Sequence, residues 1–293
     1  MQKIFVLTAL VMALATPAMP QPDDQGPQPP TPPAAPAAVP DSAQRVTVPF
    51  SDPSRPGTLK VHTIMGSMTV KGTSRKDALI EAQPPANAPA SRRRPQEEPP
   101  PGLRRLTQNG GFTAEENRNE IDVDVSRADR RMNFTIEVPV RTNLELETVM
   151  GTITVEGVDG DLEVESVNGA ITLTNVSGSV VAHSVNGKLV ATVTRPTPQK
   201  PMAFTSMNGS VDVTLPAAVK ANLRLRSDQG DVYTDFDLQL RQDSNPKPDV
   251  RISRNGRTRA IDIDKAIYGS VNGGGPEFEM RTFDGNVYVR KAK

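Results

Sequence analysis

A nine-residue pattern in strict register constrains this chain more than any other feature of its sequence. Five consecutive units follow it, and they begin at Thr142, Gly151, Gly160, Gly169 and Gly178. Each unit has apolar residues at its third, fifth and eighth positions. Alternation at the third and fifth positions is typical of a half-buried β-strand, and Gly, often preceded by Asn or Asp, marks a turn that needs a positive φ. The pattern predicts short strands whose apolar positions, Val167 and Val185 included, lie in the core.

The units alternate in kind, so the true repeat is 18 residues long. One kind ends in Ser or Thr, an apolar residue and usually Asn before the next Gly, as in Ser166-Val167-Asn168 and Ser184-Val185-Asn186. The other kind ends in Gly157-Val158-Asp159 or Asn175-Val176-Ser177. A repeat with two strands per coil cannot bury its apolar face alone, but stacked copies can.

An antiparallel meander is the alternative to stacked coils, because Asn-Gly between strands is a strong signal for a β-hairpin. In a meander, neighbouring strands run in opposite directions, so the asymmetric apolar pattern would invert from one unit to the next. Here it runs in one direction only, and related units open at Gly57 and Gly66 and include Met202 and Phe278. The sequence therefore favours an all-β fold: a single-domain β-solenoid of stacked two-strand coils of about 18 residues.

The Ser/Thr-apolar-Asn-Gly corners are interpreted as structural ladders. In strands about 4.8 Å apart, side chains at equivalent corners lie above one another. Asn tolerates a left-handed turn, and its amide can bond to the coils on either side. A nucleophilic Ser would need a nearby base, and none recurs at the corner. The residues assigned to this turn ladder are Asn168, Gly169, Asn186, Gly187, Asn208 and Gly209.

Carboxylates gather at the outward positions of the first strand type. Glu145 and Glu147 are expected to stack on Glu163 and Glu165, with Asp161 alongside. Like charges on neighbouring strands repel, so this face could bind a divalent cation or a partner, or supply the acid and base of a polysaccharide-cleaving enzyme. Glu alternating with apolar residues is also the ordinary surface of a strand. We expect no catalytic residue, no cofactor and no resident metal.

The segments outside the repeats define the domain organisation. Residues 1–18 combine a basic residue, a short apolar run and small residues, as in a cleaved signal peptide. Residues 19–43 form a Pro-rich disordered linker, or tether. Residues 44–293 form the β-repeat domain, with a Pro- and Arg-rich loop at 83–106 and an insertion at 236–275.

Charge and cysteine content exclude several classes of partner and site. The 34 Lys and Arg balance the 34 Asp and Glu, so no overall field attracts nucleic acid. With no cysteine, the chain has no disulfide, no lipid-modified cysteine and no thiolate metal site. We expect an exported protein, periplasmic, cell-surface or secreted, without a transmembrane segment in its mature form.

Three segments carry a resemblance to a known family. They read "GTLKVHTIMGSMTVKG", "LELETVMGTITVEGVDGDLEVESVNGAITLTNVSGSVVAHSVNGKLV" and "SVNGGGPEFEMRTFDGNVYVRK". In these segments the chain resembles the bacterial adhesin-like family of the DUF4097 type, which is related to toastrack β-repeat domains of envelope proteins. The resemblance implies stacked β-coils on an exported or membrane-associated protein, and it supplies no catalytic residue to transfer.

These observations lead to one functional hypothesis and two alternatives. The hypothesis is a non-catalytic, exported adhesion or interaction scaffold at the bacterial envelope. Its partner would be an envelope or surface protein or a glycan. Free sheet edges would invite self-association or capping by strands near Val46 and Ile121. The alternatives are a polysaccharide-acting enzyme that uses the Glu145, Glu147, Glu163 and Glu165 face, and a module that senses envelope stress.

Overall fold

A computed structural model describes residues 44–85, 111–125, 131–240, 249–252, 259–262 and 266–293. The expected signal peptide and linker, most of the 83–106 loop and part of the 236–275 insertion lie outside the described residues. Within them, every regular element is a β-strand, and no long apolar helix that could cross a membrane is present. Twenty strands belong to one sheet, while β18 (Asp249–Ile252) and β19 (Arg259–Asp262) form a separate antiparallel pair.

Most strands of the large sheet form two parallel stacks. In spatial order, the first stack contains β6 (Glu120–Val125), β2 (Gly57–Met65), β8 (Thr142–Met150), β10 (Asp159–Asn168), the second part of β11 (Ile171–Asn186), β13 (Met202–Asn208), β21 (Glu277–Asp284) and β15 (Ala221–Ser227). The second stack contains β7 (Asn133–Pro139), β3 (Met68–Thr73), β9 (Ile153–Glu156), the first part of β11, β12 (Leu189–Pro196), β14 (Val211–Leu215), β22 (Val287–Lys291) and β16 (Val232–Thr234). Each coil contributes one strand to each stack. The prediction of a β-solenoid is therefore confirmed, and the antiparallel meander is excluded for these coils.

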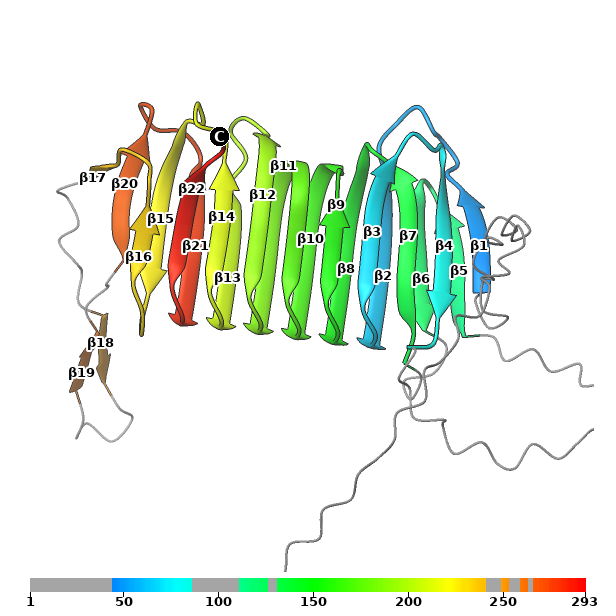
Figure 1. The fold of residues 1–293 in the computed structure, drawn as a ribbon, viewed down its shortest axis with the longest axis horizontal. Coiled ribbons are helices and arrows are strands. Elements are labelled where there is room, and N and C mark those ends of the chain that lie inside the picture. Colours follow the sequence, from blue (N-terminus) through cyan, green and yellow to red (C-terminus); the bar gives the residue numbers. More distant parts are fainter. Residues whose placement is uncertain (1–43, 86–110, 126–130, 241–248, 253–258, 263–265) are drawn as a thin grey trace, which may run out of the picture. The chain divides into compact units, whose positions relative to one another are not determined.

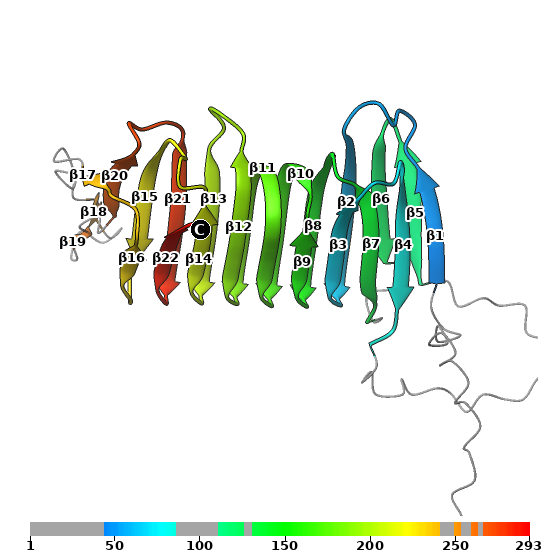
Figure 2. The same cartoon turned by 45° about the horizontal axis from the view of Figure 1, so that its top comes forward.

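At both ends of the array, the order of the coils differs from the order of the chain. The coil β21–β22 lies between β13–β14 and β15–β16, because β21 pairs with both β13 and β15. The coil β2–β3 likewise lies between β6–β7 and β8–β9. Figure 1 shows both insertions, a red coil among yellow ones and a blue-cyan coil among green ones, and Figure 2 shows the same order from another side.

Antiparallel strands extend the sheet beyond these coils. At one end, β5 (Phe112–Asn117) pairs with β6, β4 (Asp77–Gln83) pairs with β7, and β1 (Gln44–Pro49) pairs with β4. At the other end, β20 (Ile267–Val271) pairs with β15, and β17 (Gln239–Leu240) pairs with β20. Val46 thus lies in an end strand, as expected, whereas Ile121 lies in β6 and is itself covered by β5.

One continuous core runs between the two stacks. It contains the third- and fifth-position residues of the repeat, such as Leu162 and Val164 of β10, which are at most 2% exposed. The eighth position divides into two classes. Val158 and Val176 are buried, but Val167 and Val185 are each 39% exposed, so their predicted place in the core is wrong.

The backbone explains this difference. β10 continues as a strand through Asn168, so the period-two alternation turns Ser166 inward and Val167 outward. β9 instead ends at Glu156, before Gly157, which has a φ of 67°. The chain turns there, and Val158 enters the core. One nine-residue pattern therefore encodes two different corners.

Candidate interaction surface

Buried hydroxyl groups close the Ser/Thr-apolar-Asn-Gly corners, along the lower edge of the sheet in Figure 1. In five adjacent coils, from Thr148 to Thr282, the hydroxyl donates a hydrogen bond to the carbonyl oxygen of a glycine in the neighbouring coil, whereas Thr63 Oγ1 at the corner of β2 has no hydrogen-bond partner. Ser206 Oγ lies 3.0 Å from the oxygen of Gly187, and Thr282 Oγ1 lies 2.8 Å from that of Gly209. Because Ser206 and Thr282 are buried, water cannot replace these bonds, and the hydroxyls have a structural role.

Replacing Thr282 with valine is expected to lower the free energy of unfolding by about 1 kcal/mol, because the shape of the side chain is kept while its hydrogen bond to Gly209 is lost. The matched control is Thr205→Val, the same exchange at a half-buried outward position, which should change stability by less than about 0.5 kcal/mol. Urea unfolding of both variants measures the difference. Equal effects would contradict a stabilising role for the buried hydroxyl.

Asparagine side chains form a short ladder at the same corners. Asn186 Nδ2 donates to Asn168 Oδ1 at 2.9 Å, and Asn208 Nδ2 donates to Asn186 Oδ1 at 2.7 Å. None of the three has a positive φ, and they end the extended strands β10, β11 and β13. The interpretation that these asparagines adopt a left-handed turn is therefore wrong. The left-handed asparagine lies at the other corner, where Asn175 has a φ of 52°.

The glycines that follow are required by close approach of the backbone. A Cβ atom on Gly169 would lie 1.8 Å from the carbonyl oxygen of Gly151, and one on Gly187 would lie 2.1 Å from that of Gly169. A Cβ on Gly209 would lie 2.3 Å from the oxygen of Gly187. Consecutive coils thus meet backbone to backbone at this corner, and any side chain would separate them.

Directly beside these corners runs an exposed row of apolar side chains, here called the apolar ridge. Its members occupy the outward position between the buried hydroxyl and the strand end in six spatially consecutive coils. They are Ile64, Val149, Val167, Val185, Met207 and Phe283. Their exposed fractions range from 37% for Val149 to 53% for Met207. The next coil, β15, has Asp228 after the hydroxyl of Ser227, so the ridge ends there.

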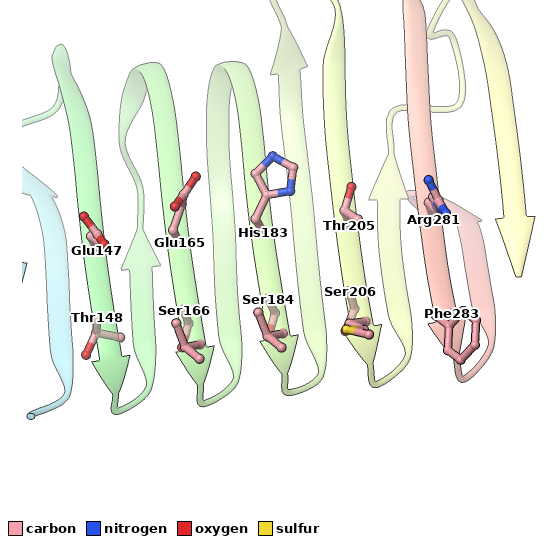
Figure 3. A pocket seen from close by; sticks show the side chains of 13 residues that line it. Glu147, Thr148, Glu165, Ser166, His183, Ser184, Thr205, Ser206, Arg281 and Phe283 are labelled. Carbon is pink, nitrogen blue, oxygen red and sulfur yellow. The ribbon is translucent and has the colours of Figure 1, made fainter. Parts of the chain in front are cut away.

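A row of polar and charged side chains, here called the charged row, runs parallel to the ridge two residues earlier in each strand. The register of the strands places its members next to one another in the order His62, Glu147, Glu165, His183, Thr205 and Arg281. Figure 3 shows five of them side by side, with Thr148, Ser166, Ser184 and Ser206 nearer the corner. The row is acidic at Glu147 and Glu165 and basic at Arg281.

The ridge and the charged row border a shallow groove of about 420 Å³ along the first stack. Glu147, Glu165, His183 and Arg281 line one side, and the ridge residues from Val167 to Phe283 line the other (Figure 3). Arg281 lies 3.8 Å from Asp228, and 45% of its side chain remains exposed. The groove therefore combines an accessible apolar side with a charge gradient along its length.

The five carboxylates expected to form an acidic face do lie on one side of the sheet, with Glu163 beside Glu145 and Glu165 beside Glu147. Three of them also have a basic residue close by, two of them a lysine and one a histidine. Lys60 Nζ lies 3.3 Å from Glu145, His62 Nδ1 lies 3.2 Å from Glu147, and Lys200 Nζ lies 2.8 Å from Asp161. The hydrogen bond that the ammonium group donates to Glu120, together with the one it donates to Glu145, raises the pKa of Lys60 above its ordinary value. These contacts reduce the negative charge that a cation would meet.

The arrangement also bears on metal binding and catalysis. Across the described ranges, no group of three or more His, Asp or Glu side chains is arranged to hold a metal ion. Glu147 has 56% of its side chain exposed, and Glu165 is also exposed. A general acid that works near neutral pH usually needs a buried, apolar setting, which this face does not provide.

Sequence reasoning missed both the ridge and the role of Arg281 in the charged row. The signal was present in the corner itself. If Ser166 and Ser184 continue the inward alternation of the third and fifth positions, Val167 and Val185 must point outward. Arg281 could not be placed in the same row as Glu165 and His183 from the chain order, because β21 joins the array through its pairing with β13 and β15.

Comparisons with known proteins place this architecture among described folds. Residues 50–265 match the family model described as Toastrack DUF4097. Among curated proteins, no significant match is found. The match to the family model thus extends over most of the repeat region.

A search of solved structures also finds matches, two of which are described here. A "putative cell adhesion protein" from Clostridium sporogenes is 10% identical, with a TM-score of 0.40, and the alignment covers 85% of this chain and 100% of that one. A "putative adhesin" from Bacteroides fragilis is 8% identical, with a TM-score of 0.28, and the alignment covers 86% and 98% of the two chains. Similarities of this strength assign no activity to the chain.

Proposed function

The chain belongs to the Toastrack DUF4097 family, and from this premise we propose that it is a non-catalytic scaffold that binds a partner at the bacterial envelope. The contact surface is the apolar ridge together with the charged row. The solenoid holds both rows on strands whose spacing is fixed by backbone hydrogen bonds. The partner therefore meets a rigid surface and loses little binding free energy to ordering it.

The exposed apolar ridge is the observation that carries this proposal. Six apolar side chains in adjacent coils are each more than a third exposed, although the neighbouring outward positions of the same strands are polar. A contiguous apolar strip bordered by polar residues is a common sign of a protein–protein contact site, because burying it on binding is favourable. The charged row beside it would set the orientation of the partner.

Export and an envelope location are part of the proposal. They are supported by the sequence of residues 1–18, which has the composition of a signal peptide, and by the Pro-rich segment 19–43, whose composition suits a tether between an export signal and a folded domain. The two solved structures described as cell adhesion protein and adhesin fit an adhesive role.

Aspartate substitutions in the ridge test the proposed contact surface. The double variant Val167→Asp with Met207→Asp should reduce retention of the purified full chain on envelope fragments by at least about tenfold, because two carboxylates would be desolvated in the contact. The control is Thr154→Asp with Thr172→Asp on the outward face of the second stack, which should bind like the wild type. A ridge variant that is folded and retained as well as the wild type would contradict the proposal.

The same preparations separate binding from catalysis. We expect no release of reducing ends from any envelope polysaccharide, either by the wild type or by a double variant in which Glu147 and Glu165 are replaced by Gln. Turnover that is lost in this double variant would instead support a polysaccharide-cleaving enzyme.

A further inference from the structure

The ridge and the charged row are complementary to themselves, and we propose that they join two copies of the chain in an antiparallel dimer. The inference rests on the proposed function, because it names the partner of the same surface. The two-fold axis lies parallel to the strands of the first stack and passes beside Val185. Each ridge then faces the other ridge with the direction of the coils reversed.

The sizes of the ridge side chains support this arrangement. Along the array, the ridge begins with small side chains at Val149 and Val167 and ends with larger ones at Met207 and Phe283, with Val185 between them. Reversal about Val185 places Val149 opposite Phe283 of the second copy, and Val167 opposite Met207. Away from the axis, each contact therefore pairs a small side chain with a large one, and only at the axis do two small side chains, the two copies of Val185, face each other.

The charges lead to the same axis independently. Glu147 lies two coils before His183 in the array, and Arg281 lies two coils after it. The reversal therefore brings Glu147 of each copy next to Arg281 of the other. In the single chain Glu147 lies 3.2 Å from His62 and Arg281 lies 3.8 Å from Asp228, but both side chains remain about half exposed, at 56% and 45%, so each can contact a second partner. A surface that repeats this match on both copies is what a two-fold symmetric dimer requires.

The other way of facing the two ridges fits less well. An axis parallel to the solenoid would place Phe283 against Phe283 and Val149 against Val149, so the aromatic rings would hold the valines apart. It would also prevent the ion pairs between Glu147 of one copy and Arg281 of the other. In the next outward row, the preferred axis would bring Glu145 opposite Glu279. The repulsion between these carboxylates is reduced, because Glu145 already has a cationic neighbour in Lys60 and Glu279 has one in Arg224.

The length of the ridge sets the expected strength of the dimer. The axis beside Val185 brings five coils of each copy, from β8 to β21, into ridge-to-ridge contact, and at about 4.8 Å per coil this contact is about 19 Å long. Ile64 lies outside it. Stable complexes bury roughly 1,200 Å² of surface or more. A contact of this length along one edge of the sheet buries a smaller area. The dimer should therefore exchange with the monomer, with a Kd in the micromolar range.

Single cysteines test the geometry directly, because the chain has no cysteine of its own. With a bismaleimide reagent that spans about 10 Å, the distance between packed sheet faces, Val185→Cys should cross-link two copies, since position 185 lies at the axis. Val149→Cys should not, because its two copies would be about 19 Å apart, four coil spacings. A mixture of Val149→Cys and Phe283→Cys chains should cross-link to each other. Thr172→Cys, on the outward face of the second stack, is the control that should remain unlinked.

A charge exchange tests the ion pairs in solution without a cross-link. By sedimentation velocity of the full chain at increasing concentration, Glu147→Arg and Arg281→Glu alone should each weaken the dimer by about tenfold or more. The double variant restores opposite charges across the axis and should return the Kd to within about threefold of the wild type. Thermal unfolding of each variant checks that the fold is kept.

Several outcomes would overturn the dimer. They are a wild type that stays monomeric at several hundred micromolar, about equal cross-linking of Val149→Cys and Val185→Cys, and a double charge variant no better than the single ones. If the wild type is monomeric but Val167→Asp with Met207→Asp still lowers retention on envelope fragments, the dimer is wrong and a different partner uses the surface. If the ridge substitutions change neither measurement, the proposed function fails as well.

Discussion

Replacing Gly169 with alanine is expected to lower the free energy of unfolding by about 4 kcal/mol or more, or to prevent folding altogether. The added Cβ would lie 1.8 Å from the carbonyl oxygen of Gly151 and 2.5 Å from its carbonyl carbon. Both are backbone atoms in a coil held by hydrogen bonds on both sides, so neither can move away as a flexible side chain could. The two coils would have to separate at the corner, which breaks the bond from the amide of Gly151 to Asn168 O.

The matched control is Gly269→Ala in β20. There the nearest atoms to an added Cβ would be Leu238 Cδ2 at 3.4 Å and Gln239 O at 3.5 Å, which are ordinary contacts. This variant should change stability by less than about 1 kcal/mol. Urea unfolding followed by circular dichroism measures both proteins. If Gly169→Ala is as stable as Gly269→Ala, the coils do not meet backbone to backbone at this corner.

Replacing Phe204 with alanine is expected to cost about 3 to 5 kcal/mol of unfolding free energy, because it removes a fully buried aromatic ring and leaves a cavity. Phe204 occupies the fifth position of its repeat, inside the core. Neighbouring strands are fixed by their register, so the cavity can collapse only in part.

Phe283→Ala provides the comparison, since Phe283 occupies the eighth position of its repeat unit, at the corner, and is 43% exposed. The loss of stability for the monomer should be below about 1 kcal/mol, whereas dimerisation through the ridge should weaken. Unfolding measured at a low protein concentration, where the monomer dominates, separates these effects. Similar losses for Phe204→Ala and Phe283→Ala would indicate that the eighth position is part of the core after all.

Much of the fold could be predicted because the local pattern and the tertiary packing agree. Leu162 and Val164 recur 18 residues later as Val180 and Ala182, and the structure pairs them in that register. Only parallel coils bury such a pattern on one side without inverting it, so the pattern identified both the two-strand coil and the direction of stacking.

The candidate site was predicted less completely. The stacking of Glu145 on Glu163 and of Glu147 on Glu165 follows from the 18-residue register alone. The ion pairs that modify this face do not, because Lys60 belongs to a coil placed beside β8 by a pairing across 85 residues of sequence. No sequence spacing indicates that Lys60 and Glu145 lie 3.3 Å apart.

The sequence by itself determined the class of fold, the coil length and which residues form the strands, because these depend on apolar alternation and on glycine at the corners, and both are local. The tertiary structure decided the order of the coils and the fate of the eighth position. Strand pairing placed β21–β22 inside the array, which put Arg281 in the charged row, at the end opposite to Glu147. The backbone at each corner decided whether a valine entered the core, as Val176 does after the left-handed Asn175, or joined the exposed ridge, as Val185 does near the extended end of the same strand.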